Sequence, residues 1–191
     1  MNNPLRVKTA NRAEVGIAVE WAAQEGWNPG LSDAGCYYSA DSDGFLIGYL
    51  GDEPIATISA VKYGNGFGFL GFYIVKEEYR RQGYGRQIWD TALKGLEGRN
   101  ICLDGVVEQQ ENYKKSGFKL AYRNIRYEGV TGGEPPQFEQ LVDLSAVPFD
   151  SIDTYDRPFF PDERTALIQS WVNQPGCIAL GIMADGVLSG Y

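Results

Sequence analysis

Histidine is absent from all 191 residues of this sequence. Its absence excludes Ser-His-Asp and Cys-His catalysis, histidine-ligated zinc sites and a histidine general base. Cysteine is scarce as well. Cys36, Cys102 and Cys177 are odd in number and widely spaced, so they predict neither a disulfide framework nor a metal cluster. Any chemistry that this protein performs therefore proceeds without imidazole, and we expect no metal ion.

Long apolar runs are also missing. No stretch reaches the roughly 18 apolar residues that a membrane-spanning helix requires, and the first ten residues, MNNPLRVKTA, lack the apolar centre of a signal peptide. With 43% hydrophobic and 22% charged residues, the composition favours a packed core over global disorder. We expect a soluble, cytoplasmic protein of one domain, or of one domain plus a fragment of another.

Basic side chains are nearly missing from the last third of the chain. Residues 1–127 contain 15 acidic and 15 basic side chains, whereas residues 128–191 contain 10 acidic ones and only Arg157 and Arg164 as basic ones. The net charge of −8 therefore belongs to the C-terminal part, which suggests two units with different surfaces. Without a dominant basic patch, nucleic-acid binding is not expected. The stretch GVTGGEPPQ, residues 129–137, coincides with this shift and predicts a linker between units 1–128 and 138–191.

Hydrophobic periodicity predicts a mixed sheet in the first unit. Strands are expected at residues 5–9, 44–50, 55–63, 67–75, 100–106 and 118–129. Helices are expected at residues 11–27, within 28–41 after a cap at Ser32, from the glycines at 83–85 through about 96, and at 108–118. A three-strand meander followed by two βα units predicts an α+β or mixed α/β fold rather than a doubly wound sheet.

Local signals refine this outline. Asn11, followed three residues later by Glu14, predicts a capped helix start, and Gly117 predicts a helix end. Gly71, inside an aromatic strand, predicts a bulge or a close backbone approach. Beyond the linker we expect a strand at residues 138–144, a helix at 162–176 and a hairpin at 177–191.

The stretch EEYRRQGYGRQIWD, residues 77–90, carries two glycines among three arginines. It is not a Rossmann fingerprint, because Ile88 stands where a third glycine is needed, and it is not a P-loop, because Gly-Lys-Ser/Thr is missing. Two interpretations remain from the residues alone: a helix start with solvated arginines, or a pyrophosphate cradle. In the cradle, Gly83 and Gly85 let backbone N–H groups approach an anion, and the following helix offers its positive end.

The order Arg80-x-x-Gly83-x-Gly85, after an aromatic strand and before an amphipathic helix, resembles the acetyl-CoA motif of the GNAT superfamily of N-acetyltransferases. The resemblance covers about residues 5–128. It implies a mostly antiparallel central sheet flanked by helices, with acetyl-CoA as co-substrate. It also implies that the pyrophosphate lies on the backbone amides of the turn and that pantetheine binds along the preceding strand. The expected cofactor-binding residues are Tyr73, Ile74, Val75, Arg80, Arg81, Gln82, Gly83, Tyr84, Gly85 and Arg86.

A second signature of the family is a tyrosine four residues before a Gly-Phe pair, here Tyr113 before Gly117 and Phe118. The resemblance implies that Tyr113 is the acid that protonates the leaving thiolate, because a phenol with a pKa of about 10 keeps its proton at neutral pH. The alternative is a half-buried packing tyrosine. The sequence departs from the family where many members carry an asparagine: Val106 stands near that position, with Asp104 and Asn112 nearby.

No general base is evident in the sequence. Asp104, Asp33 and Glu25 are candidates, each of which could equally be a surface group or a helix cap, and a chain of waters is the remaining option. Trp21 and Trp27 lie in the region that lines the acceptor side in this family, where they could hold a cation or serve as core anchors.

The C-terminal part resembles the first helix and hairpin of a second, divergent GNAT-like domain, as in a subgroup that carries two such domains. We expect residues 138–191 to be a partial α/β segment of this kind, and the chain to be truncated. Exposed strand edges would then favour self-association, with a homodimer as one form.

The function expected is transfer of an acetyl group from acetyl-CoA to a primary amine of a small molecule or peptide, by direct attack. The alternative is a non-catalytic acyl-CoA-binding or scaffold module of the same fold. A nucleotide-binding or NAD-binding protein is a weaker third interpretation.

Overall fold

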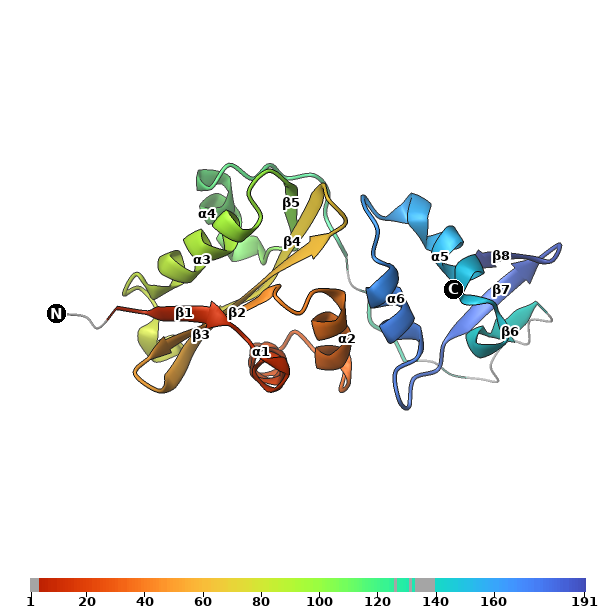
Figure 1. Ribbon diagram of the computed structural model, residues 1–191, viewed down its shortest axis with the longest axis horizontal. Coiled ribbons are helices and arrows are strands. Elements are labelled where there is room, and N and C mark those ends of the chain that lie inside the picture. The colour runs from red at the N-terminus through yellow and green to blue at the C-terminus, as the bar shows by residue number, and fades with distance from the viewer. Residues whose placement is uncertain (1–3, 126, 131, 133–139) are drawn as a thin grey trace.

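The computed structural model describes residues 4–125, 127–130, 132 and 140–191. Its first part is built on a five-stranded sheet with the order β1-β2-β3-β4-β5 (Figure 1). The strands are β1 Arg6–Thr9, β2 Phe45–Leu50, β3 Glu53–Tyr63, β4 Phe67–Val75 and β5 Asn100–Leu103. Neighbouring strands are antiparallel except β4 and β5, which are parallel. The predicted fold class, a mixed and mostly antiparallel sheet flanked by helices, is confirmed.

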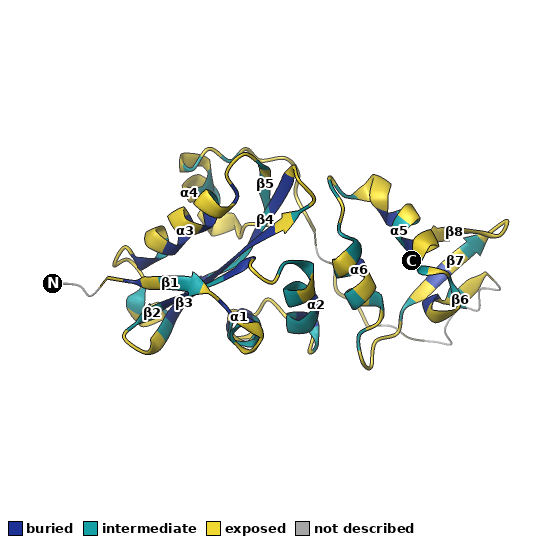
Figure 2. Cartoon of the chain, in the orientation of Figure 1, coloured by how far each residue is buried: buried dark blue, intermediate teal, exposed yellow. Residues whose placement is uncertain are grey.

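Helices cover both faces of this sheet (Figure 1). They are α1 Arg12–Gln24, α2 Asp33–Ala40, α3 Tyr84–Gly95 and α4 Gln110–Lys115. One core lies between the sheet and α3, around Ile58, Leu70 and Ile88. The other lies between the sheet and α1, around Val15 and Phe45. Between these two cores, residues 55–61 of β3 are all buried, and β4 contains both buried and intermediate residues (Figure 2).

The predicted helix starts are confirmed in one case and corrected in the other. At α1, the side chain of Asn11 accepts the N–H groups of Ala13 and Glu14, and the Glu14 carboxylate accepts the N–H of Asn11. This is the predicted capping box. At α2, Ser32 makes no capping bond with its side chain. Instead, Asp33 accepts the N–H of Gly30 at 2.7 Å, because the longer carboxylate reaches back across the turn.

The predicted strand at 118–129 is wrong for the residues described there. Residues 118–125 form no strand, and Leu120 and Tyr122 are 56% and 67% exposed. The segment touches the end of β5 through a side chain, since Asn124 Nδ2 donates to Asp104 Oδ1 at 3.2 Å. A strand-like pattern is stable as a strand only when it pairs and buries one face. Here neither condition is met.

The second part, residues 140–191, contains a three-stranded antiparallel sheet with the order β6-β7-β8 and two helices (Figure 1). The elements are β6 Leu141–Asp143, α5 Phe149–Asp156, α6 Thr165–Val172, β7 Leu180–Ala184 and β8 Val187–Gly190. Leu144, Ile152, Ile168 and Leu188 form its small core. The predicted hairpin is confirmed, with Asp185 and Gly186 both at positive φ in the turn. The predicted strand is confirmed only over β6; its residues 138–139 lie outside the described part.

Helix α5 was not predicted from the sequence. Its residues, FDSIDTYD, are mostly weak helix formers, so propensity gave no signal. Tertiary contact supplies the stability instead, because Ile152 is 2% exposed within the small core. The remaining short elements are the 3-10 helices η1 Glu77–Tyr79, η2 Val107–Gln109, η3 Leu144–Ala146 and η4 Arg157–Phe159. Among the residues described, none of the helices combines the length and apolarity that crossing a bilayer requires.

One face of the three-stranded sheet is apolar and partly exposed, which favours self-association. Leu141, Leu180 and Ile182 are 41–44% exposed and Val187 is 67% exposed. Such patches commonly mark association surfaces. We expect light scattering at high protein concentration to give a mass above the 21.1 kDa of one chain, and Ile182→Lys to lower it. A single species of one chain's mass for the unmodified protein would contradict this expectation.

Candidate functional site

The last five residues of β4 leave its parallel partner. Pairing between β4 and β5 ends at Leu70 and Leu103, so within the described part of the chain no strand pairs with the β5-facing edge of residues 71–75. At the same place the register with β3 shifts, because Ser59 pairs with Gly71 but Thr57 pairs with Ile74. A bulge, one of the two features predicted at Gly71, is therefore present. It contains Phe72 and Tyr73, the two residues that follow Gly71. An open edge of this kind offers backbone groups to an extended ligand.

The turn after this edge has free backbone donors. Among the described residues, the N–H groups of residues 81–86 find no acceptor, whereas Arg80 N–H donates to Glu77 O and Gln87 N–H donates to Gly83 O. Arg81 and Gly83 both have positive φ, of 61° and 88°. Alternation of left-handed and right-handed residues makes a concave nest of N–H groups, which is a recurrent anion-binding shape. The first turn of α3 adds its positive end.

Two of the three arginine side chains of this turn, those of Arg80 and Arg86, are engaged elsewhere. Arg80 Nε donates to Val75 O at 2.7 Å, and its guanidinium is paired with Glu25 at the end of α1. Arg86 Nε donates to Asp90 at 2.9 Å, one helical turn further on. Arg80 thus ties the end of β4 to the start of the turn. The backbone, more than these guanidinium groups, is left to contact an anion.

The other predicted cofactor-binding residues fall into two groups: some have side chains in the hydrophobic core, and others have side chains beside the turn. Tyr84 and Ile74 are both 5% exposed and their side chains belong to the core. Tyr73 faces α3 instead, and a Cβ at residue 85 would come within 2.6 Å of its hydroxyl. Gly85 is therefore required for the Tyr73 hydroxyl to lie against the turn. Gln82 is exposed, and its side-chain amide donates to Glu78 O.

Tyr113 belongs to α4, and its ring lies beside the C-terminal end of β5, where β4 and β5 separate. Its ring stacks on Trp89 with centroids 5.8 Å apart and planes at 28°. On another side it lies so close to Gly105 that a Cβ at that residue would overlap the ring. Burial raises the pKa of Tyr113 above its ordinary value of 10.0. The phenol therefore keeps its proton throughout the neutral range.

Trp89 is a candidate site residue that no pattern in the sequence singled out. It is 5% exposed, and its Nε1–H finds no hydrogen-bond acceptor within the described residues. Around it stand Tyr73 at 5.2 Å, Tyr113 at 5.8 Å and Phe118 at 5.9 Å between ring centroids. A buried donor without an acceptor costs about 1–3 kcal/mol. A buried donor of this kind requires an explanation, and an ordered water or a ligand atom as its partner would provide one.

The three candidate bases all have partners. Glu25 is paired with Arg80, and Asp104 accepts a bond from Asn124. Asp33 is 5% exposed and accepts bonds from Gly30 N–H and from the Tyr37 hydroxyl at 3.2 Å. None of the three carboxylates is left unbonded beside the opening between β4 and β5.

The remaining predicted positions are peripheral or structural. Asn112 donates to Gln109 at the start of α4, and Val106 is 41% exposed. Trp21 is buried against Ile74, with the Lys76 ammonium 5.6 Å from its ring centre, so it is both a core anchor and a cation partner. Trp27 is 38% exposed.

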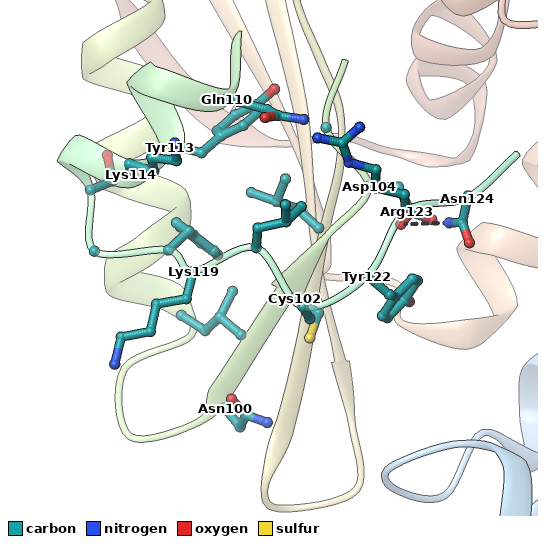
Figure 3. Close-up of a pocket in the computed structure, with 18 of the residues that line it drawn as sticks. Asn100, Cys102, Asp104, Gln110, Tyr113, Lys114, Lys119, Tyr122, Arg123 and Asn124 are labelled. Atoms are coloured by element: carbon teal, nitrogen blue, oxygen red, sulfur yellow. Dashed lines mark hydrogen bonds between the residues drawn. The ribbon is translucent and has the colours of Figure 1, made fainter. Parts of the chain in front are cut away.

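A groove of about 990 Å³ runs along the outer edge of β5, between α4 and residues 116–125 (Figure 3). Tyr113, Cys102 and Tyr122 contribute to its walls. It exists because the segment after α4 crosses the end of β5 instead of pairing with it. The groove reaches Tyr113, but none of residues 81–86, whose free N–H groups form the anion-binding turn, lines it.

Together these groups fit an acyl-CoA. The free N–H groups of residues 81–86 match a pyrophosphate, the open edge of β4 matches an extended pantetheine arm, and Tyr113 stands beside the opening between the strands. The glycines at 83, 85 and 105 stand where a side chain would be strained or would overlap a neighbour.

Comparison with known proteins agrees with this geometry. Residues 14–118, more than half of the chain, match the acetyltransferase (GNAT) family. The holothin acyltransferase of Pseudoalteromonas sp. (strain SANK 73390) is 34% identical over 182 residues, which are 95% of this chain and 62% of that protein. The chain therefore spans less than two thirds of the length of this relative.

Two crystal structures show the same fold. A protein of Pyrococcus horikoshii assigned as an acetyltransferase has a TM-score of 0.77 at 22% identity, over 96% of this chain and 69% of that one. A protein of Clostridium acetobutylicum assigned as an acetyltransferase, solved with acetyl-CoA, has a TM-score of 0.51 at 16% identity, over 65% of this chain and 96% of that one.

Proposed function

The chain belongs to the GNAT family of acetyltransferases, and from this premise we propose that it transfers an acetyl group from acetyl-CoA to a primary amine of a small molecule or peptide. The observation that carries the proposal is the run of free N–H groups at residues 81–86 beside the open edge of β4. These two features would accept the two ends of the CoA arm and leave the thioester next to Tyr113.

Binding would use backbone more than charge. The amides from Arg81 to Arg86 would hold the pyrophosphate oxygens, and residues 73–75 would hold the pantetheine amides. Arg80 would contribute indirectly, because it fixes the Val75 carbonyl and the turn. The Trp89 N–H, which has no acceptor among the described residues, would donate to an oxygen of a ligand that enters between Tyr73 and Tyr113.

The reaction would be direct attack. The amine lone pair forms a C–N bond with the thioester carbon, the C–S bond breaks, the sulfur takes a proton and the nitrogen loses one. Tyr113 would give its proton to the sulfur, since its half-buried phenol, with a pKa raised above 10.0, is protonated at neutral pH. Because the candidate carboxylates are all hydrogen-bonded, we propose that water carries the proton away from the amine.

Calorimetry and a transfer assay test this function. We expect acetyl-CoA to bind with a dissociation constant in the micromolar range, about −8 kcal/mol, while NAD and ATP produce no thermal shift. Free thiol should then appear when acetyl-CoA is mixed with an acceptor from a panel of small amines, peptides and holothin, the last because of the relative's name. Folded protein that does not bind acetyl-CoA would contradict the proposal.

A second candidate function is an acyl-CoA-binding module without turnover. The observation that favours it is that the three candidate bases, Glu25, Asp33 and Asp104, are all paired or hydrogen-bonded. Tight acetyl-CoA binding combined with no thiol release across the whole panel would support the module and exclude the enzyme.

A further inference from the structure

Residues 140–191 pack against the first part through helix α6, which lies beside α2 (Figure 1). Trp171 of α6 contacts Tyr37 of α2, with ring centroids 6.1 Å apart. One residue earlier on each helix, Ser170 Oγ donates to Cys36 Sγ at 3.4 Å, and Cys36 is 2% exposed. The contact therefore reaches a buried position on α2.

The loop before α6 makes a second contact. Phe160 lies edge-on to Tyr63 and Phe67, with centroids 4.9 and 5.2 Å apart, and Asp162 accepts the N–H of Gly66 at 2.9 Å. A side chain at Gly64 would overlap the Asp162 carboxylate. The β3–β4 turn is thus shaped to receive this loop.

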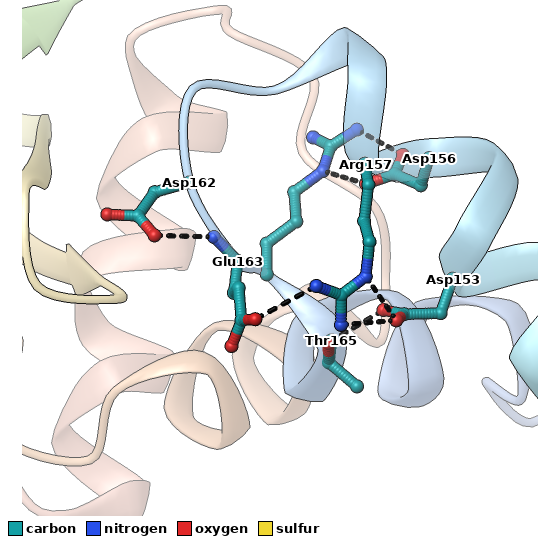
Figure 4. A network of polar contacts seen from close by, with 7 residues as sticks. Asp153, Asp156, Arg157, Asp162, Glu163 and Thr165 are labelled. Atoms are coloured by element: carbon teal, nitrogen blue, oxygen red, sulfur yellow. Dashed lines mark hydrogen bonds and ion pairs between the residues drawn. The ribbon is translucent and has the colours of Figure 1, made fainter.

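The loop itself is held by ion pairs (Figure 4). Arg157 bridges Asp153 and Glu163, and Arg164 forms two bonds to Asp156, which is 5% exposed. Both contacts with the first part therefore come from a segment whose conformation is held by ion pairs within residues 140–191.

The α2 contact continues to the bulge of β4. The ring of Tyr37 lies 5.3 Å from that of Phe72 in an edge-on arrangement, and Phe72 has a φ of +46°. An aromatic residue in the left-handed region costs about 1–3 kcal/mol and persists only where its surroundings hold it. Here Thr57 Oγ1 donates to Phe72 O at 2.9 Å, and the rings of Tyr37 and Phe45 hold the side chain. Trp171 stands behind Tyr37.

We propose that Trp171 is a positioning residue for acyl transfer. Through Tyr37 it holds Phe72 in the strained bulge at which β4 leaves β5, so residues 140–191 support the site and are not an independent appendage. This inference rests on the proposed function, because it takes the acceptor amine to bind on the α2 side of the opening, where Phe72 lies against Tyr37. The structural coupling itself does not require turnover.

Hydrogen exchange of the whole 191-residue chain tests the coupling. Trp171→Ala is expected to speed amide exchange in residues 71–72 about tenfold, while exchange in residues 73–75 and in β1 stays within about twofold. Trp171→Phe, which keeps an aromatic ring against Tyr37, is expected to restore slow exchange. Phe159→Ala is the matched control, because its ring packs on Tyr155 within the C-terminal unit. Unchanged exchange in residues 71–72 for folded Trp171→Ala would overturn the inference.

Kinetics test the consequence. Trp171→Ala is expected to raise the KM for the acceptor about tenfold while the dissociation constant of acetyl-CoA stays within about twofold. If acetyl-CoA binding weakens as much as the KM for the acceptor rises, the positioning role is overturned. Faster amide exchange without any change in the KM for the acceptor would overturn it as well. If the unmodified protein binds acetyl-CoA but transfers nothing, the proposed function fails, and the exchange measurement alone decides the coupling. If Trp171→Ala fails to fold, Trp171→Leu takes its place, because leucine keeps apolar volume without a ring.

Discussion

Replacing Gly83 by tryptophan is expected to weaken acetyl-CoA binding about 100-fold, which corresponds to roughly 2.7 kcal/mol. Gly83 has a φ of 88°, and it lies in the middle of the free N–H groups of the turn. A large side chain both strains this backbone and covers the amides. Losing charge-assisted bonds to a phosphate costs about 1.5–3 kcal/mol each. Calorimetry with acetyl-CoA measures the change directly.

The chain offers a matched control just past the other end of the same helix. Gly98 has a φ of 80° and, like Gly83, has open space where a Cβ would stand, with no neighbouring atom within 4 Å. Gly98→Trp therefore introduces similar backbone strain without touching the turn, and acetyl-CoA binding should stay within about twofold. Arg86→Gln, which removes one charge already paired with Asp90, should cost less than about fivefold. Equal losses in the two glycine variants would contradict the cradle.

Replacing Tyr113 by phenylalanine is expected to lower kcat about 100-fold to 10,000-fold, which is the usual contribution of a positioned general acid. Acetyl-CoA affinity should be retained, because the stacked ring on Trp89 is preserved and only the hydroxyl is removed. Steady-state kinetics with calorimetry on the same preparation separates the two effects. An unchanged kcat would contradict the role of Tyr113 and leave it as a packing residue.

Tyr73→Phe is the matched control, since Tyr73 carries the other phenol against Trp89. It should reduce kcat less than about fivefold if Tyr113 is the acid. The pH profile adds a further check. Burial raises the pKa of Tyr113 above 10.0, and the acid acts in its protonated form, so its ionisation should lower kcat only above pH 10. A larger loss of kcat in Tyr73→Phe than in Tyr113→Phe would assign the role of the acid to Tyr73 instead of Tyr113.

The elements that were predicted well carry strong local signals. β4 was predicted at its observed bounds, residues 67–75, because a run of aromatic and β-branched residues ended at polar turns. The capping box at Asn11 and the left-handed Gly117 are likewise local, with all interacting groups within a few residues. The segment at 118–129 has a similar strand-like pattern, but its state depends on a partner, and propensity cannot supply one.

The sequence by itself determined that these 191 residues contain no imidazole, that the first part is a mixed sheet with a glycine turn before a helix, and that this turn can present backbone amides. Those conclusions depend on residue type and short-range geometry. Only the tertiary structure decided that Arg80 is tied to Glu25 and Val75, and that Trp89 stacks on Tyr113 with an unsatisfied N–H. It alone also decided that Trp171 reaches the strained Phe72 through Tyr37. These contacts join residues far apart in the chain, and packing, which spacing along the sequence does not encode, brings them together.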